Sequence, residues 1–171
     1  GVAMIALASA ALHEMGHIVA LFIFGGRPDK IDFGIFGVRI QQNKNTLSDF
    51  GQAVVVMSGP VVNALIFLIM LMLYSLFSIN VFLTISAVNL VSGIFNLIPI
   101  FPLDGGRILL AILGAMLSDK GACTVMRVVS KLMIPVLVFW GILLVRKTGA
   151  NISLFVTGVY LGILCIKSIR I

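Results

Sequence analysis

The sequence predicts an all-α polytopic membrane protein with about five to six membrane-spanning helices and one short β-hairpin at the membrane surface. Composition is the first observation: 60% of the 171 residues are hydrophobic and 11% are charged, whereas a soluble domain has about 25% charged residues. Second, long apolar runs alternate with short polar segments. Third, basic residues fall at the ends of these runs, which is typical of membrane topology and argues against a nucleic-acid partner. We expect one integral-membrane domain over residues 1–171.

Residues 1–24 are predicted to form the first membrane helix, which contains His13-Glu14-Met15-Gly16-His17. Positions i and i+4 share one face of a helix, so His13 and His17 can bind one metal ion together. Glu14 lies about 100° round the helix from His13, close enough to reach a water on that metal. Such a pattern also occurs by chance, but an unbound His-Glu-His set in hydrocarbon costs several kcal/mol. We therefore expect a metal site with Glu14 as its catalytic residue.

The next segment is predicted to leave the membrane, because Gly25-Gly26 ends the first helix. Residues 31–40 partly alternate between apolar and polar side chains, which indicates the β-hairpin, with an irregular amphipathic loop as the alternative. A second helix is expected from about Asp49 to Phe77. Its Ser58-Gly59-Pro60 permits close helix packing, and Pro60 would kink it. Asn63 is polar and needs a hydrogen-bond partner in the membrane. These residues could therefore serve helix packing alone, or they could belong to the functional site.

A third apolar run spans about residues 80–98 and leads into Asn96-Leu97-Ile98-Pro99-Ile100-Phe101-Pro102-Leu103-Asp104-Gly105-Gly106-Arg107. The prolines and glycines cannot continue an ordinary helix, yet apolar sequence resumes over residues 108–117. We therefore predict one discontinuous membrane crossing. Irregular backbone at membrane depth is tolerated only when it is buried in protein or lines a wet cavity, so this segment marks an active site or a transport site.

The remaining chain is predicted to hold two more helices. Residues 119–131 are expected to be a polar connection, followed by a helix over about residues 132–145 that starts somewhat before residue 132, and by a turn at 146–149. The last helix is expected over residues 151–166, where Gly158 and Gly162 form a face for helix packing.

Basic residues give the expected orientation. If the proline-rich crossing is one span, residues 25–49, 118–131 and the C-terminus share one side of the membrane. That side carries nine of the 12 basic residues, namely Arg27, Lys30, Arg39, Lys44, Lys120, Arg127, Lys131, Lys167 and Arg170. The positive-inside rule therefore places it in the cytosol. His17 lies seven residues before Phe24, roughly 10 Å of helix, so the site should lie in the bilayer nearer the cytosolic face of the cell membrane.

Asp104 is the natural third ligand, because a catalytic zinc usually has three protein ligands and an open position for water. Of the six acidic residues, only Glu14 and Asp104 lie deep in apolar sequence, and Glu14 is the expected base. A salt bridge from Asp104 to Arg107 is the alternative, and Arg107 can act as an outer partner of the site in either case. Zn²⁺ lowers the pKa of a bound water to about 7, and Glu14 would pass its proton to the leaving amine.

A peptide within a bilayer is normally helical, so its carbonyl groups are blocked. We expect an edge of this protein to pair with the unwound substrate as an added strand. Either the segment Asn96–Leu103 or the predicted hairpin at residues 31–40 could supply that edge.

Three motifs together resemble the site-2 protease family of intramembrane zinc metalloproteases. They are the His13–His17 motif, Ser58-Gly59-Pro60, and the segment from Asn96 through Pro99 and Pro102 to Gly106, in the family's order. The resemblance covers about residues 3–117, and the short chain is most similar to the bacterial sporulation-factor IV FB branch.

This resemblance implies zinc bound by His13, His17 and Asp104, with Glu14 catalytic. It also implies that Asn96, Pro99 and Pro102 shape a loop that positions substrate. Members of that branch cleave a membrane-associated pro-sigma factor and are held by inhibitory membrane partners. They usually have six spans, so a helix before Gly1 is expected to be missing.

A metal transporter or a catalytically silent metal-binding membrane protein is the competing interpretation. A transporter would carry further ionisable residues along a path through the membrane. Here they cluster at one depth, around Glu14, Asp104 and Arg107, and a silent homologue would have lost Glu14 or a ligand. The sequence therefore favours the protease.

Overall fold

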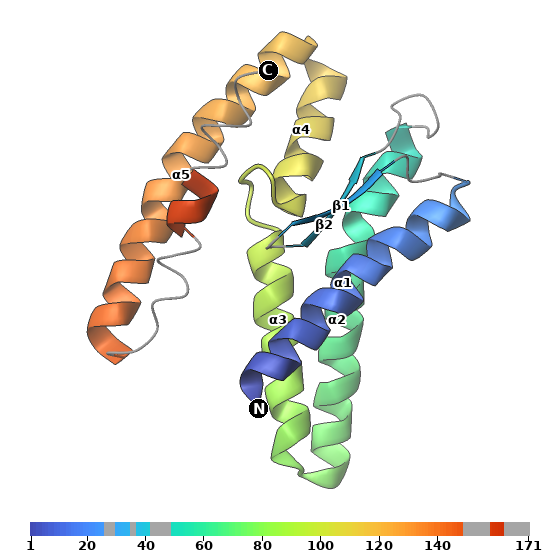
Figure 1. The fold of residues 1–171 in the computed structure, drawn as a ribbon, viewed down its shortest axis with the longest axis vertical. Coiled ribbons are helices and arrows are strands. Elements are labelled where there is room, and N and C mark those ends of the chain that lie inside the picture. The colour runs from blue at the N-terminus through green and yellow to red at the C-terminus, as the bar shows by residue number, and fades with distance from the viewer. Residues whose placement is uncertain (26–29, 35–36, 42–48, 149–157, 163–171) are drawn as a thin grey trace. The chain divides into compact units, whose positions relative to one another are not determined.

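The computed structural model describes residues 1–25, 30–34, 37–41, 49–148 and 158–162. The chain forms two compact units, Gly1–Asn96 and Leu97–Ile171. The first runs from blue to green in Figure 1, and the second continues from there to red.

The described residues of the first unit form three helices and two strands. They are α1 (Val2–Ile23), β1 (Lys30–Gly34), β2 (Gly37–Gln41), α2 (Asp49–Phe77) and α3 (Asn80–Asn96). The predicted end of the first helix is confirmed, since Gly25 follows α1 with a φ of 74°. This left-handed conformation suits glycine because a Cβ would be strained there. The second helix has the predicted bounds, with Pro60 inside it.

Small and polar residues form the buried face of α1. Ser9, His13, Gly16 and His17 are buried there, whereas Leu7 is 73% exposed. The helix α3 follows the same rule, with Ser86, Asn89 and Gly93 buried. Polar and small residues inside with large apolar residues outside is the pattern of helices that face lipid.

Close approaches and hydrogen bonds hold these helices together. A Cβ on Gly16 would lie 2.8 Å from Val62 Cγ2, so α1 packs directly on α2 only because glycine stands there. Ser9 Oγ donates a hydrogen bond of 2.9 Å to Asn89 Oδ1, which links α1 to α3. Hydrogen bonds of this kind stabilise membrane helix packing by about 0.6 kcal/mol each.

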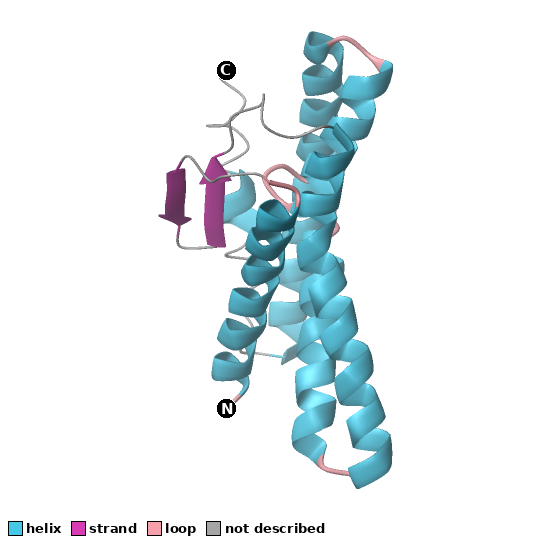
Figure 2. Cartoon of the chain, turned by 90° about the vertical axis from the view of Figure 1, so that its right-hand side faces the viewer, coloured by secondary structure: helices cyan, strands magenta, loops and turns pink. Residues whose placement is uncertain are grey.

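The segment predicted as a hairpin forms two antiparallel strands, β1 and β2. Figure 2 shows the two strands in magenta. Lys30 pairs with Gln41 at one end of the ladder, and Gly34 pairs with Gly37 at the other. Residues 35–36 between the strands lie outside the described residues. The turn of the hairpin and its place at a membrane surface therefore stay predictions.

The second unit contains α4 (Asp104–Met116) and α5 (Asp119–Thr148), which pack against each other. The predicted break in the third apolar run is confirmed, because residues 97–103 are not helical and helix resumes at Asp104. That α3 and α4 form a single crossing stays a prediction. Phe101 N–H donates to Ser130 Oγ at 3.3 Å, which fixes the loop to α5.

The prediction of a polar connection over residues 119–131 is wrong, because α5 begins at Asp119. Ser118 caps this helix, since its Oγ accepts a hydrogen bond of 3.3 Å from Gly121 N–H. Asp119 in the first turn also interacts favourably with the helix dipole. These start signals at Ser118 and Asp119 outweigh the polar character of the segment.

Only residues 158–162 of the predicted last helix are described, and they are helical. A Cβ on Gly158 would lie 3.0 Å from Val138 Cγ2, and one on Gly162 would lie 3.5 Å from Ile134 Cγ2. The predicted packing face of these two glycines is therefore confirmed, and its partner is α5.

In the part of the chain that the structure describes, three helices are long and apolar enough to cross a membrane, spanning Val2–Ile23, Gly51–Phe77 and Asp119–Leu143. Asn80–Asn96 is a shorter apolar helix. These helices support a membrane protein.

Candidate metal centre

His13 and His17 lie on the buried face of α1. Their side chains are 4% and 5% exposed, and their Nε2 atoms are 3.2 Å apart. The two rings meet nearly edge to face, at an interplanar angle of 86°. Two nitrogens bound to one tetrahedral zinc at about 2.0–2.1 Å are about 3.3–3.4 Å apart. The spacing of this histidine pair therefore fits one zinc ion.

Helix α2 holds the outer nitrogen of His17. Nδ1 of His17 lies 2.7 Å from the backbone oxygen of Val55, and a carbonyl can only accept, so Nδ1 carries the proton. Ser58 Oγ donates to the same oxygen at 2.7 Å. With its proton on Nδ1, His17 presents the Nε2 lone pair toward His13, which is the arrangement that metal-binding histidines use.

Asn63 holds the outer nitrogen of His13 in a similar position. Its Nδ2 lies 3.2 Å from His13 Nδ1. The side chain is 0% exposed. Among the described residues, its Oδ1 has no hydrogen-bond partner. The partner that Asn63 was predicted to need is thus His13.

Gly59 lies between these two contacts on α2. A Cβ there would collide with His17 Nε2 and would lie 2.6 Å from His17 Cε1 and 2.7 Å from His13 Cε1. Val55, Gly59 and Asn63 are spaced four residues apart, so they share one face of α2. This face is the wall against which both imidazoles rest.

Glu14 and Asn96 also belong to this unit. Glu14 follows His13 on α1 and is half-buried. Asn96 is the last residue of α3, and its Nδ2 lies 3.4 Å from His13 Nε2, at the long end of hydrogen-bond distances. Asn96 therefore borders the metal-binding edge of the ring, whereas Asn63 borders the outer edge.

Asp104 opens helix α4 in the second unit and is 7% exposed. Arg107 Nη1 lies 3.9 Å from its Oδ1, and the Arg107 side chain is 44% exposed. Such a long contact to an exposed arginine is a weak ion pair. The carboxylate of Asp104 can therefore serve as a metal ligand with Arg107 beside it.

The two glycines after Asp104 let the preceding loop fold back onto α4. A Cβ on Gly105 would collide with the backbone oxygen of Leu97, and one on Gly106 would lie 2.6 Å from that of Ile100. Pro99 and Pro102 lie in this loop and are half-buried, and the Phe101–Pro102 bond is cis. The prolines and glycines together define how Asp104 enters its helix.

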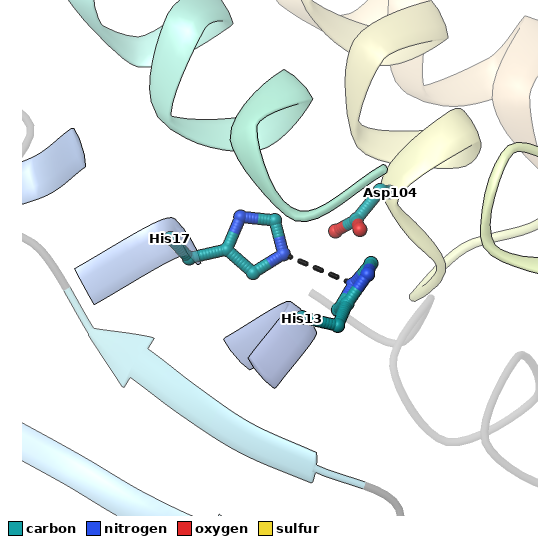
Figure 3. A group of neighbouring side chains, drawn as sticks. All are labelled: His13, His17 and Asp104. Atoms are coloured by element: carbon teal, nitrogen blue, oxygen red, sulfur yellow. Dashed lines mark hydrogen bonds between the residues drawn. The ribbon is translucent and has the colours of Figure 1, made fainter. Parts of the chain in front are cut away.

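His13, His17 and Asp104 form the one group in the described part of the chain whose side chains could together hold a metal ion. Each offers one ligand atom, and these atoms lie within 4.8 Å of one another (Figure 3). Two imidazole nitrogens and one carboxylate are a common donor set for catalytic zinc. The residues fit the metal that the sequence predicts.

Sequence reasoning missed two parts of this site. The backbone oxygen of Val55 gives no signal in a sequence, because every residue has one. The contact of Gly59 with the rings could have been suspected from its place in Ser58-Gly59-Pro60, for which the sequence left helix packing and a part in the site both open.

Comparisons with known proteins find similarity to zinc metalloproteases. The family model described as "Peptidase family M50" matches residues 76–140. A zinc metalloprotease of Methanocaldococcus jannaschii is 31% identical over 153 residues, which are 86% of this chain and 44% of that protein. A putative zinc metalloprotease of Synechocystis is 29% identical over 115 residues, which are 64% of this chain and 30% of that protein. This chain thus spans less than half of either relative.

A solved structure extends the similarity to the fold. The site-2 protease from Methanocaldococcus jannaschii matches with a TM-score of 0.75 and 28% identity, over 98% of this chain and 77% of that one. The family model, the relatives and this structure all show similarity to peptidase family M50 and to the site-2 proteases.

Proposed function

We propose that this chain is the catalytic part of a zinc metalloprotease that cleaves peptide bonds within or next to the membrane. The observation that carries the proposal is the set of three possible ligand atoms within 4.8 Å of one another. Two of them lie on α1, which is long and apolar enough to cross a membrane. Zinc, when bound, supplies a Lewis acid that acidifies a water molecule and polarises a peptide carbonyl. His13, His17 and Asp104 would hold it.

Glu14 is the proposed general base and acid. It adjoins His13 on α1, and it would accept a proton from the attacking water and return it to the leaving amine. Because it is the only glutamate in the chain, no neighbouring glutamate can substitute for it. The half-buried environment excludes part of the bulk water, which strengthens the electrostatic effect of the ligands and of the base.

Substrate is proposed to bind as an extended strand. Asn96 borders the metal-binding edge of His13, so it is well placed to hold a substrate carbonyl or amide near the scissile bond. The loop over residues 97–103, shaped by Pro99 and Pro102, or the strands β1 and β2 would supply the edge that pairs with the unwound peptide.

The site is proposed to lie within the cell membrane, nearer the cytosolic face. The basic segment at residues 25–49 and Lys120 support this orientation by the positive-inside rule. Because α5 begins at Asp119, Arg127 and Lys131 lie inside a helix. The rule counts basic residues near the ends of spans, so Lys120 still contributes to it.

The substrate is proposed to be a membrane-associated precursor whose cleavage releases a regulatory protein. Similarity to the sporulation-factor IV FB branch makes a pro-sigma factor the first substrate to try, with inhibitory membrane proteins as further partners. This assignment rests on the motifs over residues 13–106.

The test is cleavage of a panel of membrane-bound precursors, including a sporulation pro-sigma factor, by the protein in reconstituted membranes. Glu14→Gln, which keeps the size and the polar character of the side chain, is the matched control. We expect cleavage by the intact protein alone, while both proteins hold zinc. Equal cleavage by both would remove Glu14 from the mechanism and point to a contaminating protease. Bound zinc without cleavage of any precursor would favour a silent metal-binding protein.

A further inference from the structure

The loop over residues 97–103 satisfies most of its own backbone donors. Its two prolines have no N–H group. Ile100 N–H donates to Ile98 O at 2.7 Å, and Leu103 N–H donates to Ile100 O at 2.8 Å. From residue 99 to residue 103, Phe101 N–H is therefore the one backbone donor whose acceptor lies outside the loop.

Ser130 of α5 supplies that acceptor. Its Oγ lies 3.3 Å from Phe101 N. The Ser130 side chain is 0% exposed, and the side chain of Ile100, which precedes Phe101, is fully buried as well. Water therefore does not reach the position of this hydroxyl. If the hydroxyl were removed, the N–H of Phe101 would be left without a partner, and a buried donor without a partner destabilises the place where it lies.

Ser130 lies on a ridge of α5 that is packed on both sides of it. Ala122 and Met126 precede Ser130 at intervals of four residues, so they share its face of the helix, and both are buried. The next two positions at this spacing are Ile134 and Val138, which contact the two glycines of residues 158–162. Because α5 is held at positions before and after Ser130, the hydroxyl is a fixed point against which the loop can rest.

Helix packing alone does not explain this serine. Ser86 on α3 shows what packing requires, because its buried Oγ donates at 3.1 Å to Phe67 O, a carbonyl inside helix α2. Both partners of that bond belong to regular helices. Ser130 Oγ instead accepts from a loop N–H. Polar side chains in apolar helices are costly and mark functional positions, so the difference between the two serines points to a role for Ser130 in the loop.

We propose that Ser130 is a positioning residue of the protease: its hydroxyl holds the loop over residues 97–103 against α5 at Phe101, so that the loop keeps substrate in place beside the metal centre. The inference rests on the proposed function, in which this loop positions substrate. Asp104 is held separately, because it begins helix α4 and belongs to the backbone hydrogen-bond pattern of that helix. Removing the hydroxyl therefore loosens the loop and leaves the metal ligand in place.

Ser130→Thr and Ser130→Val form the matched pair for the test, because their side chains have the same shape and only threonine keeps the hydroxyl. In the precursor cleavage assay in reconstituted membranes, we expect the KM of Ser130→Val to be about 10-fold higher than that of Ser130→Thr. Zinc content should be equal in the two. A smaller folded fraction would lower the apparent kcat but leave KM unchanged, so KM separates positioning from stability. Equal KM values, or loss of zinc in Ser130→Val alone, would overturn the inference.

Amide hydrogen exchange of the same proteins tests the anchor without any substrate. Residues 98–103 carry four backbone N–H groups, because two of the six residues are prolines. We expect one of these amides to lose protection in Ser130→Val and to keep it in Ser130→Thr. Ser86→Ala is the control, which removes another buried hydroxyl and should change neither the exchange of this loop nor KM.

Unchanged exchange in Ser130→Val, or the same change in Ser86→Ala, would refute the anchor. Failure of the unaltered protein to cleave any precursor would instead refute the proposed function, and the exchange result would still show whether Ser130 holds the loop.

Discussion

Replacing Gly59 with alanine should remove zinc from the protein without unfolding it. The added Cβ would lie 2.6 Å from His17 Cε1, whereas ordinary van der Waals contact begins near 3.4 Å, so that ring has to retreat by about 0.8 Å. Zinc ligands tolerate displacements of only about 0.2 Å. A retreat several times larger takes the Nε2 atom of His17 out of reach of an ion held by the other two ligands.

Folding should survive this change because the atoms that the new Cβ meets are the ends of two side chains, which can rotate away. Overpacking of this kind costs about 1–3 kcal/mol. Zinc affinity should fall by about 100-fold or more. Loss of a residue that only orients a zinc ligand costs about 10- to 100-fold, and here the ligand itself is displaced.

The assay is zinc content and zinc affinity of the purified protein, measured by elemental analysis and by competition with a chelator. Gly114→Ala is the matched control, because a Cβ on Gly114 has nothing within 4 Å. The control should bind zinc as the unaltered protein does. Full zinc affinity in a folded Gly59→Ala protein would show that the rings do not rest against α2 as the structure has them, and the reasoning would fail.

Three further changes separate packing from chemistry. Gly105→Ala should lower the thermal unfolding midpoint more than Gly59→Ala does, because its Cβ would collide with the backbone of Leu97, which cannot rotate away; an unchanged midpoint would contradict the close packing of the loop. Ser9→Ala removes the hydrogen bond to Asn89 and should cost about 0.6 kcal/mol of unfolding free energy while zinc affinity stays the same. Loss of zinc in that variant would mean that this bond also positions the site. Asn96→Ala should impair cleavage in the precursor assay and keep zinc bound; a zinc-free Asn96→Ala protein would instead make Asn96 part of the metal site.

Local periodicity was enough to predict that His13 and His17 lie together and to predict most of the described helices. His13 and His17 share a face of any α-helix, whatever surrounds it, because the spacing of four residues is a property of the helix alone. The bounds of α2 and the break at residues 97–103 followed in the same way from the apolar run and from the prolines. The start of α5 could also have been predicted, since the cap at Ser118 is a local signal that the polar composition of the segment obscured.

The sequence by itself therefore determined which residue types could hold and activate a metal, because those depend on side-chain chemistry and on spacing within one element. Only the tertiary structure decided which neighbouring residue each polar side chain contacts. Asn63 and Asn89 are both buried asparagines in apolar helices, and only the packing shows that the first meets His13 and the second meets Ser9. Side chains project from a helix in all directions around its axis. Which residue each asparagine contacts is therefore set by how α1, α2 and α3 pack against one another.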